Sequence, residues 1–409
     1  MMEYGLPFLK QKLNSKQLRV RTRYNYYDMK IVVSELSSIL PKEFSWLAYS
    51  LGWCAKAVDS LADRIVFDTF SCDDFALNEI YRLNNADVLH DDAVLSALIS
   101  SCSFICIGQD STGYPTMQVI DGGNATGIID PVTKMLTEGY AVLKRDEHGT
   151  PELEAYFRPN QTDYFVRGRL DTEQTFMHQA PYALLVPIIN RPDAARPFGH
   201  SRISRTCMHI TQAVLRTFRR MDVSAEFYSF PQKYILGLSD DAEFNNRAAT
   251  ISSFLNIGKD EDGDKPTVGQ FTQQSMTPYA EQLKAYASVF AGETGLTLDD
   301  LGFTTSNPAS FDAIRASHEQ LRLTARKAQR TFGVGLLNAG YLAACIRDRI
   351  PYDRRAFANT VPQWLPVFEP DAAALGAAGD AILKINQAVP DFIGNNNIRR
   401  LTGLESDAE

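Results

Sequence analysis

The sequence predicts an α+β fold, and three observations support this prediction. Apolar residues recur every three or four positions through several long stretches, which is the pattern of amphipathic helices. Short runs rich in Val, Ile, Phe and Tyr, bounded by turn residues, cluster between residues 100 and 190 and indicate strands. The hydrophobic fraction of 44% and the aromatic fraction of 11% are high enough for a sizeable core in a chain of 409 residues.

The chain is predicted to begin with helices. A basic, tyrosine-rich run over residues 19–27 is expected to form a helix that lies on the body with solvated arginines, although such a run can also bind nucleic acid. Further helices are predicted over 42–65, 73–84 and 91–100 from their apolar faces.

A β-rich section follows, so that residues 1–200 are expected to form one α+β part. Turns are predicted at 110–113 and 146–149, where Asp, Ser and Gly gather. The predicted strands are 103–107, 116–120, 139–145, 152–157, 162–167 and 184–190.

A loop over 191–200 then leads into a long helix with an apolar stripe that ends near residue 228. The next section, 229–276, holds short regular elements on either side of an acidic turn. The carboxylates of that turn are Asp260, Glu261, Asp262 and Asp264. A calcium loop of the EF-hand type is excluded, because its sixth and twelfth positions would be Lys265 and Phe271 instead of Gly and Glu.

Residues 277–346 predict a helix, a loop and a second helix. Thr277 is expected to cap the first helix, with Pro278 at its first position, and Gly295 is expected to end it. The loop spans 296–306. Asn307-Pro308 repeats the same start signal for the second helix.

The second helix carries an apolar stripe that includes His318, and two glycines fall within it. Because paired glycines weaken a helix locally, we expect a kink at Gly333 and Gly335. The opposite face is rich in arginine between Arg315 and Arg330, which suits either a solvated or subunit-facing stripe or a contact with DNA. An alanine-rich helix over 371–389 and a short helical tail complete the chain.

Composition limits the possible functions. The net charge of −8 does not fit a protein that grips nucleic acid through many phosphate contacts. No Walker-type phosphate loop is present, and His90-Asp91-Asp92 has no second ligand pair to make a metal site. We therefore expect no cofactor and no metal, and we interpret His90-Asp91-Asp92 as a solvated helix start with Asp91 as its cap.

The predicted cellular setting follows from the cysteines and from the apolar segments. The six cysteines include no CxxC pair, so reduced and mostly buried thiols are expected, as in a cytosolic assembly pathway. No secretory signal is expected, because the first twenty residues lack a continuous apolar core. The longest apolar helical stretch, 332–346, is shorter than a bilayer requires, so no membrane is expected as a partner.

Several segments, in the same order along the chain, resemble the portal proteins of tailed bacteriophages, which form the ring at the capsid vertex through which DNA enters and leaves. The resembling segments are Ala57 to Arg64, Gly199-His200-Ser201-Arg202-Ile203, Phe230 to Gly237, Asn307-Pro308-Ala309-Ser310 and Ala313-Ile314. Helix, tunnel loop and long kinked helix follow one another in that family as they are predicted to do over 277–346.

The resemblance implies a portal fold with named parts. These are an α+β wing over 1–200, a stem helix over 201–228, a clip over 229–276, a second stem helix over 277–295, a tunnel loop over 296–306, a long kinked wing helix over 307–350, and a short helical crown over 351–409.

It also implies sites. The tunnel-loop residues that would meet passing DNA are Leu298, Asp299, Asp300, Leu301, Gly302, Phe303 and Thr304. The acidic turn of the clip, Asp260 to Asp264, would dock partner proteins. For the loop, an alternative remains open: Leu301 and Phe303 could anchor an ordinary connection in the subunit body.

The implied function is a non-enzymatic ring, typically a dodecamer, that conducts double-stranded DNA during packaging and ejection. The implied partners are further copies of the chain, double-stranded DNA, the terminase large subunit, the head-tail adaptor, the major capsid protein and a scaffold protein. The implied location is the portal vertex of the virion, after assembly in the host cytoplasm. The alternative is a nucleic-acid-processing enzyme with an unrecognised metal-dependent site.

Overall fold

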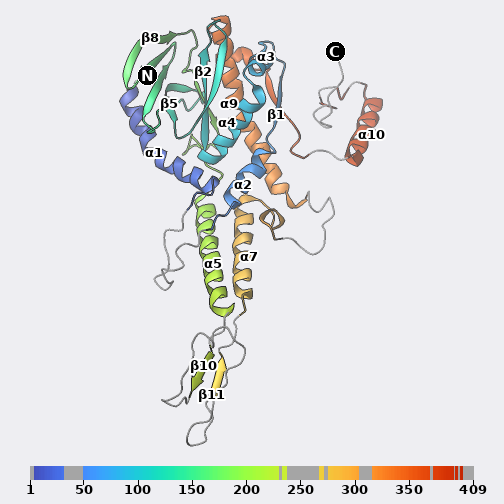
Figure 1. Cartoon of the computed structure of the whole chain (residues 1–409). Helices are drawn as coiled ribbons and strands as arrows, with labels where there is room; N and C mark the ends of the chain where they lie inside the picture. Colours follow the sequence, from blue (N-terminus) through green and yellow to red (C-terminus); the bar gives the residue numbers. More distant parts are fainter. Residues whose placement is uncertain are drawn as a thin grey trace, which may run out of the picture.

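The structure, a computed structural model, describes residues 4–31, 49–229, 233–236, 267–270, 275–303, 316–368, 372–390, 392–394 and 397–398. Figure 1 shows an elongated molecule with a broad head, a stem of two long helices and a narrow two-stranded tip. The stem helices are α5 (Arg205–Ser229) and α7 (Thr277–Thr294). The tip pairs β10 (Lys233–Leu236) with β11 (Thr267–Gln270).

The head contains three antiparallel sheets. The largest has the strand order β4 (Ala125–Ile129), β5 (Leu136–Arg145), β6 (Pro151–Arg158), β7 (Gln161–Val166) and β8 (Arg169–Met177). The second has the order β3 (Pro115–Asp121), β2 (Cys102–Gln109) and β9 (Leu185–Ile189). The third pairs β1 (Phe67–Ser71) with β12 (Val361–Trp364).

Helices cover these sheets. They are α1 (Gly5–Tyr27), α2 (Trp53–Ala62), α3 (Leu77–Leu83), α4 (Ala86–Ser100) and α9 (Glu319–Asp348). Two short 3-10 helices, η2 (Asp299–Leu301) and η3 (Arg354–Phe357), and the helix α10 (Ala372–Ala388) complete the described elements.

The core is centred on β2, whose first six residues are buried. One face of its sheet is covered by α4 and α9, since Ser103 donates to the Ala93 carbonyl at 2.6 Å and Gly335 lies against Ile188. The other face meets β5, where a side chain at Gly139 would collide with Leu185. A strand that is buried on both faces has apolar residues at successive positions, and this accounts for the apolar sequence of β2.

The N-terminal helix α1 lies along β4, an outer strand of the five-stranded sheet. Lys12 Nζ donates to the Gly127 carbonyl at 2.8 Å, and Lys16 Nζ donates to the Ala125 carbonyl at 2.7 Å. Two lysines one helical turn apart thus bind alternate carbonyls of the strand. An unpaired strand edge invites association with other chains, and this contact covers part of it.

The main predicted elements are present in the described residues, but several boundaries were wrong. The helix predicted over 42–65 spans only Trp53–Ala62 within the described part, because residues 49–52 are not helical. The helix predicted from residue 91 begins at Ala86, so Asp91 is not a cap; the cap position is Asn85, in a left-handed conformation. The first residue of α7 is Thr277, and Met276 occupies the cap position.

His90 is also placed differently from the prediction. It is not at a solvated helix start, because the residue lies within α4 and its side chain is only 4% exposed. Its ring packs against Phe67 and Tyr81, with centroids 4.3 and 5.0 Å away. Burial lowers the pKa of His90 to about 4, so the ring is neutral at ordinary pH.

Candidate functional site: the junction of head and stem

The segment Gly199 to Ile203, here called the junction segment, connects the head to the stem helix α5. Gly199 has φ of +70°, and a side chain there would collide with the Asn190 backbone, so only glycine fits. Asn190 fixes the turn by donating from Nδ2 to the His200 carbonyl at 2.7 Å and accepting from the His200 N–H at 2.9 Å.

The junction segment closes the C-terminal end of α4. The last carbonyls of a helix lack partners within it. Here the Arg202 N–H donates to the Leu98 carbonyl at 2.8 Å, and Ser201 Oγ donates to the Ile99 carbonyl at 2.6 Å. Arg23 of α1 donates to the Ser100 carbonyl at 2.9 Å. Three chain segments therefore meet at one helix end.

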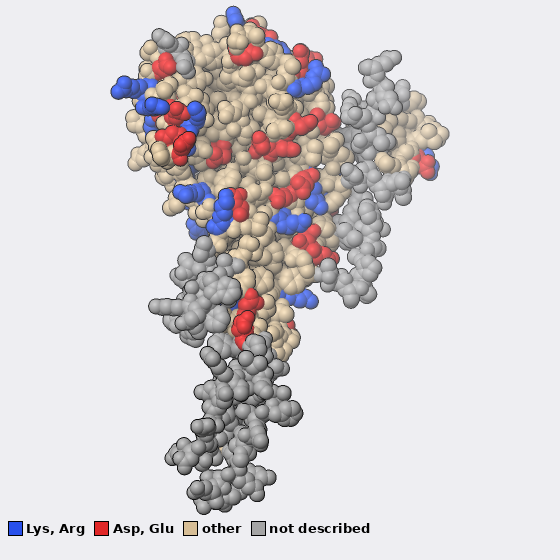
Figure 2. Space-filling model, in the orientation of Figure 1, with Lys and Arg blue, Asp and Glu red and all other residues tan. Residues whose placement is uncertain are grey.

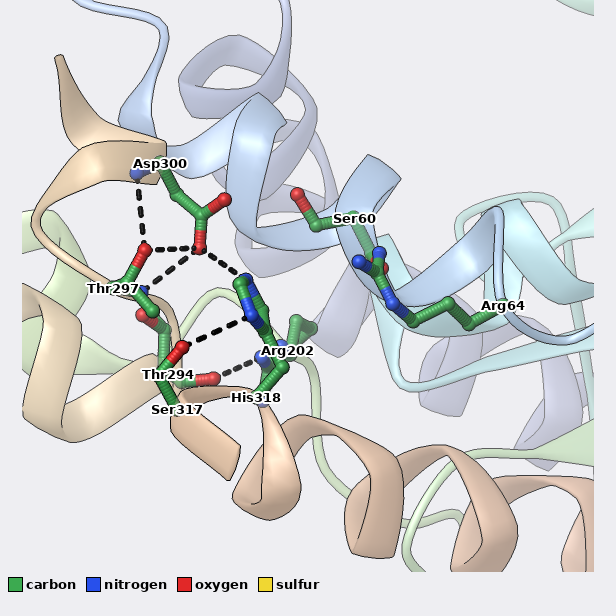
Figure 3. A network of polar contacts seen from close by, with 8 residues as sticks. All are labelled: Ser60, Arg64, Arg202, Thr294, Thr297, Asp300, Ser317 and His318. Carbon is green, nitrogen blue, oxygen red and sulfur yellow. Dashed lines mark hydrogen bonds and ion pairs between the residues drawn. The ribbon is translucent and has the colours of Figure 1, made fainter. Parts of the chain in front are cut away.

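The side chain of Arg202 extends this contact to the stem (Figure 3). It is 7% exposed, and its guanidinium donates to the Ala57 carbonyl at 3.2 Å and to the Thr294 carbonyl. Burial lowers its pKa to about 10, so it remains charged at neutral pH. Thr294 is the last residue of α7, where the partial negative charge of the helix end stabilises a cation.

A second polar cluster fastens the connection between α7 and α9 (Figure 3). Asp300 Oδ2 accepts from the N–H and from Oγ1 of Thr297, both at 2.9 Å, and lies 3.0 Å from His318 Nε2. Burial opposes ionisation of Asp300, but these hydrogen bonds outweigh it and hold its pKa below the ordinary value. His318 stands at the cap position of α9.

Apolar contacts hold the same connection against the head. Leu301 is 7% exposed, and Phe303 lies 6.4 Å from Trp53 of α2, centroid to centroid. Trp53 also meets Phe290 of α7 at 5.4 Å. Residues 296–303 are thus part of the subunit body, as the anchored alternative for the predicted tunnel loop expects.

The predicted tunnel-loop residues therefore differ in their surroundings. Asp299 and Gly302 are exposed, Leu298 is half-buried, and Asp300 and Leu301 are turned into the body. Thr304 lies outside the described residues. A contact of these residues with DNA stays a prediction.

The other predicted sites have mixed outcomes. The clip residues Asp260, Glu261, Asp262 and Asp264 lie outside the described residues. Gly333 and Gly335 lie in α9, which runs without interruption through both. A side chain at Gly333 would meet Pro362 at 2.8 Å, and one at Gly335 would meet Ile188 at 2.6 Å, so close packing accounts for both glycines. The kink there stays a prediction.

Other expectations concern ions, thiols and membranes. Within the described ranges, no group of three or more His, Cys, Asp and Glu residues is placed to hold a metal ion. Five cysteines are buried and Cys72 is exposed, all as free thiols, which confirms the expectation of mostly buried thiols. Among the helices of the described part, none is long and apolar enough to cross a bilayer.

Sequence reasoning did not find the links from Arg202 to α7 or from Asp300 to His318. A signal was present for each. Arg202 lies in a segment that combines glycine, serine and arginine directly before a helix, and His318 stands on an otherwise apolar stripe. Neither pattern indicates which residue is contacted, because Thr294 lies 92 residues from Arg202 and Asp300 lies 18 residues from His318.

Comparison with known proteins finds two sequence relatives of the same kind. No protein-family model matches the sequence. The chain is 25% identical over 346 residues to the "Portal protein" of Mycobacterium phage L5, covering 78% of this chain and 69% of that protein. It is 24% identical over 339 residues to the "Portal protein" of Mycobacterium phage D29, covering 77% of this chain and 68% of that protein.

Among solved structures, the chain resembles one described as "Neck of empty GTA particle computed with C6 symmetry". The TM-score is 0.48 at 14% identity, covering 91% of this chain and 95% of that chain. It also resembles "Virion of native gene transfer agent (GTA) particle", with a TM-score of 0.46 at 15% identity, covering 86% and 90% of the two chains. The two sequence relatives match over most of the chain: this protein is similar to the portal proteins of two Mycobacterium phages over about three quarters of its length.

Proposed function

We propose that this portal protein assembles into a ring, most simply a dodecamer, at a unique vertex of the capsid and conducts double-stranded DNA during packaging and ejection. The observation that carries the proposal is the match to two portal proteins over more than three quarters of the chain. The elongated shape supports it, because a broad head and a narrow tip joined by two helices suit a wedge in a ring (Figure 1).

The parts of the subunit are assigned on the same basis. The sheets and helices of the head, together with α9, form the wing, and α5 and α7 form the stem. The tip with β10 and β11 belongs to the clip, over 229–276, and α10 belongs to the crown. Stem helices of 25 and 18 residues would separate the clip from the wing.

The clip is proposed to dock the terminase large subunit during packaging and the head-tail adaptor afterwards. The head is proposed to meet the major capsid protein and, during assembly, a scaffold protein. The segment 296–306 is proposed to be the tunnel loop that faces the DNA, with Asp299 and Gly302 exposed and with Leu301 and Phe303 holding it to the body.

The net charge of −8 supports sliding of DNA rather than adhesion. A protein that binds DNA tightly neutralises phosphates with Lys and Arg, and its affinity falls steeply with salt. A conduit has the opposite requirement, because each tight contact would have to break as the DNA moves.

Native mass spectrometry and negative-stain images down the ring axis test the proposal. The purified chain is expected to form closed rings of many copies with a central channel. A protein that stays monomeric at every concentration and salt tested would contradict assembly by this chain. Tight, salt-sensitive binding of duplex DNA by the rings would contradict the sliding conduit.

A further inference from the structure

Groups of opposite charge lie at the two ends of the helix α4: one is on the helix itself and the other is on neighbouring segments. Asp87, Asp91 and Asp92 lie in its N-terminal half, and Asp63 follows α2 close by; these four residues are called the acidic patch. All four are exposed, and none pairs with a Lys or Arg in the described part of the chain. Val88, between them on the same helix, is 61% exposed.

The other end of α4 is surrounded by arginines. Arg23 donates to the Ser100 carbonyl, and Arg19 and Arg196 are near enough to lower its pKa further, after the larger effect of burial. These three arginines are called the basic patch. Arg19 and Arg196 are exposed and pair with no described carboxylate, and Leu18 beside them is 75% exposed.

Neither patch is explained by the isolated subunit. An acidic residue at a helix start and a cation at its end interact favourably with the helix dipole, but one residue at each end is enough for this. The acidic patch holds more negative charge than the helix dipole requires. Burial and then repulsion from Asp87, Asp92 and Asp63 raise the pKa of Asp91. Like charges gathered around an exposed apolar residue cost stability unless something of the opposite charge covers them.

The two patches are separated along α4. They are at opposite ends of a helix of 15 residues, which is about 22 Å long. In the view of Figure 2, acidic side chains are spread across the middle of the head, while a group of Lys and Arg side chains lies at its lower left, where Figure 1 places α1. A contact that joins unlike surfaces of successive copies closes into a ring when its rotation allows.

We propose that the basic patch of one copy docks on the acidic patch of the next copy around the ring. The inference rests on the ring proposed above and adds which surfaces meet. Charge complementarity fixes the direction of assembly, because two acidic or two basic flanks repel each other. Leu18 and Val88 are exposed apolar residues that lose water in the same contact.

Charge reversal tests the pairing in the full-length protein. A basic-patch variant carries Arg19→Glu and Arg196→Glu, and an acidic-patch variant carries Asp87→Lys and Asp91→Lys. Arg23 is left intact because it closes α4. The control is Lys134→Glu with Arg169→Glu, two exposed cations beside and within the five-stranded sheet whose reversal changes the net charge by the same amount as the basic-patch variant. Ring content is measured by native mass spectrometry at low and moderate salt, and folding by circular dichroism.

Each reversed variant alone is expected to lose at least nine tenths of its rings while remaining folded, and the control is expected to keep them. Mixing the two variants is expected to restore rings in which they alternate, as is combining all four substitutions in one chain, because unlike charges then meet again. Restoration excludes simple misfolding as the reason for the loss.

Two results would overturn the inference while leaving the proposed function intact. One is that wild-type and both reversed variants form rings equally well. The other is that the basic-patch variant assembles normally but its particles lose DNA retention, which would assign the arginines to DNA. Absence of rings in the wild type would instead overturn both the proposed function and the pairing.

Discussion

At the scale of single residues, His90 is the clearest departure from what the sequence suggests. A histidine beside two aspartates predicts a solvent-facing group, yet its ring is enclosed by Phe67 and Tyr81, and its buried Nε2 atom has no hydrogen-bond partner among the described residues. Such an atom costs free energy in the folded state. The aspartates that follow His90 face solvent because they stand on the other side of the helix.

The buried ring predicts a loss of stability in mild acid. The folded pKa of His90 is about 4, below the unfolded value of 6.5, so only the unfolded chain takes up this proton between those pH values. Stability therefore falls as the pH decreases from 6.5 towards 4, by about 2 kcal/mol between pH 7 and pH 5. Urea unfolding at several pH values measures this.

The variant His90→Leu is expected to flatten that dependence and to leave stability at pH 7 unchanged or slightly higher. Some dependence should remain, since burial also lowers the pKa of His178 to about 4. His148→Gln, in an exposed turn, is the control and should behave as the wild type. A pH dependence that is the same in His90→Leu and in the wild type would contradict the assignment.

At the scale of elements, the sequence predicted most helices and strands but not where they meet. Gly295 ends α7 in a left-handed conformation with φ of +70°, as its residue type indicated. The strand β4 was not predicted; its Gly127 lets Leu136 and the Glu138 backbone approach closely, which the sequence does not reveal. The strand β12 was missed because it contains Pro362, which is tolerated only in outer strands.

The glycines of α9 show why the kink could not be separated from packing by sequence alone. The sequence does not distinguish a glycine that weakens a helix from a glycine that allows a neighbouring segment to pack closely. Gly335→Ala is expected to destabilise the fold by about 1–3 kcal/mol, because its Cβ would lie 2.6 Å from Ile188 and 3.0 Å from the Pro187 carbonyl.

Gly292→Ala is the matched control for this prediction. It is also a glycine within a helix, but nothing lies near its missing side chain, so alanine should stabilise by about 0.5–1 kcal/mol. Chemical denaturation of both variants decides between the two effects. An increase in stability for Gly335→Ala would mean that α9 can move away from β9 at little cost.

At the scale of the whole molecule, recognition of the family depended on the order of short segments along the chain. The two sequence relatives confirm it and replace the interpretation as a nucleic-acid-processing enzyme, since portal proteins are structural and non-enzymatic. The site could be predicted only in part. Position along the chain located the connection after α7, but the packing of Phe303 against Trp53 joins residues that are far apart in sequence.

The acidic turn of the proposed clip leads to a prediction about assembly of particles. Replacing Asp260, Glu261, Asp262 and Asp264 with Ser is expected to leave the melting temperature and the rings unchanged, because exposed charges contribute little to folding. DNA packaging and tail joining, measured in particles, are expected to fall. Glu147→Ser, an exposed carboxylate of the head, is the control. If packaging and tail joining were normal in the fourfold variant, the turn would not dock partners and would serve only to keep the protein soluble.

The junction segment has a mechanical consequence. A load applied along the stem reaches α4 through Ser201 Oγ and the Arg202 N–H, and it reaches α7 through the Arg202 guanidinium. Hydrogen bonds are directional and act over a few tenths of an ångström, whereas apolar surfaces can slide past each other while staying in contact. We therefore expect the hydrogen bonds of this joint to pass small displacements of the stem directly to α4, more tightly than the apolar contacts of Trp53 beside them would.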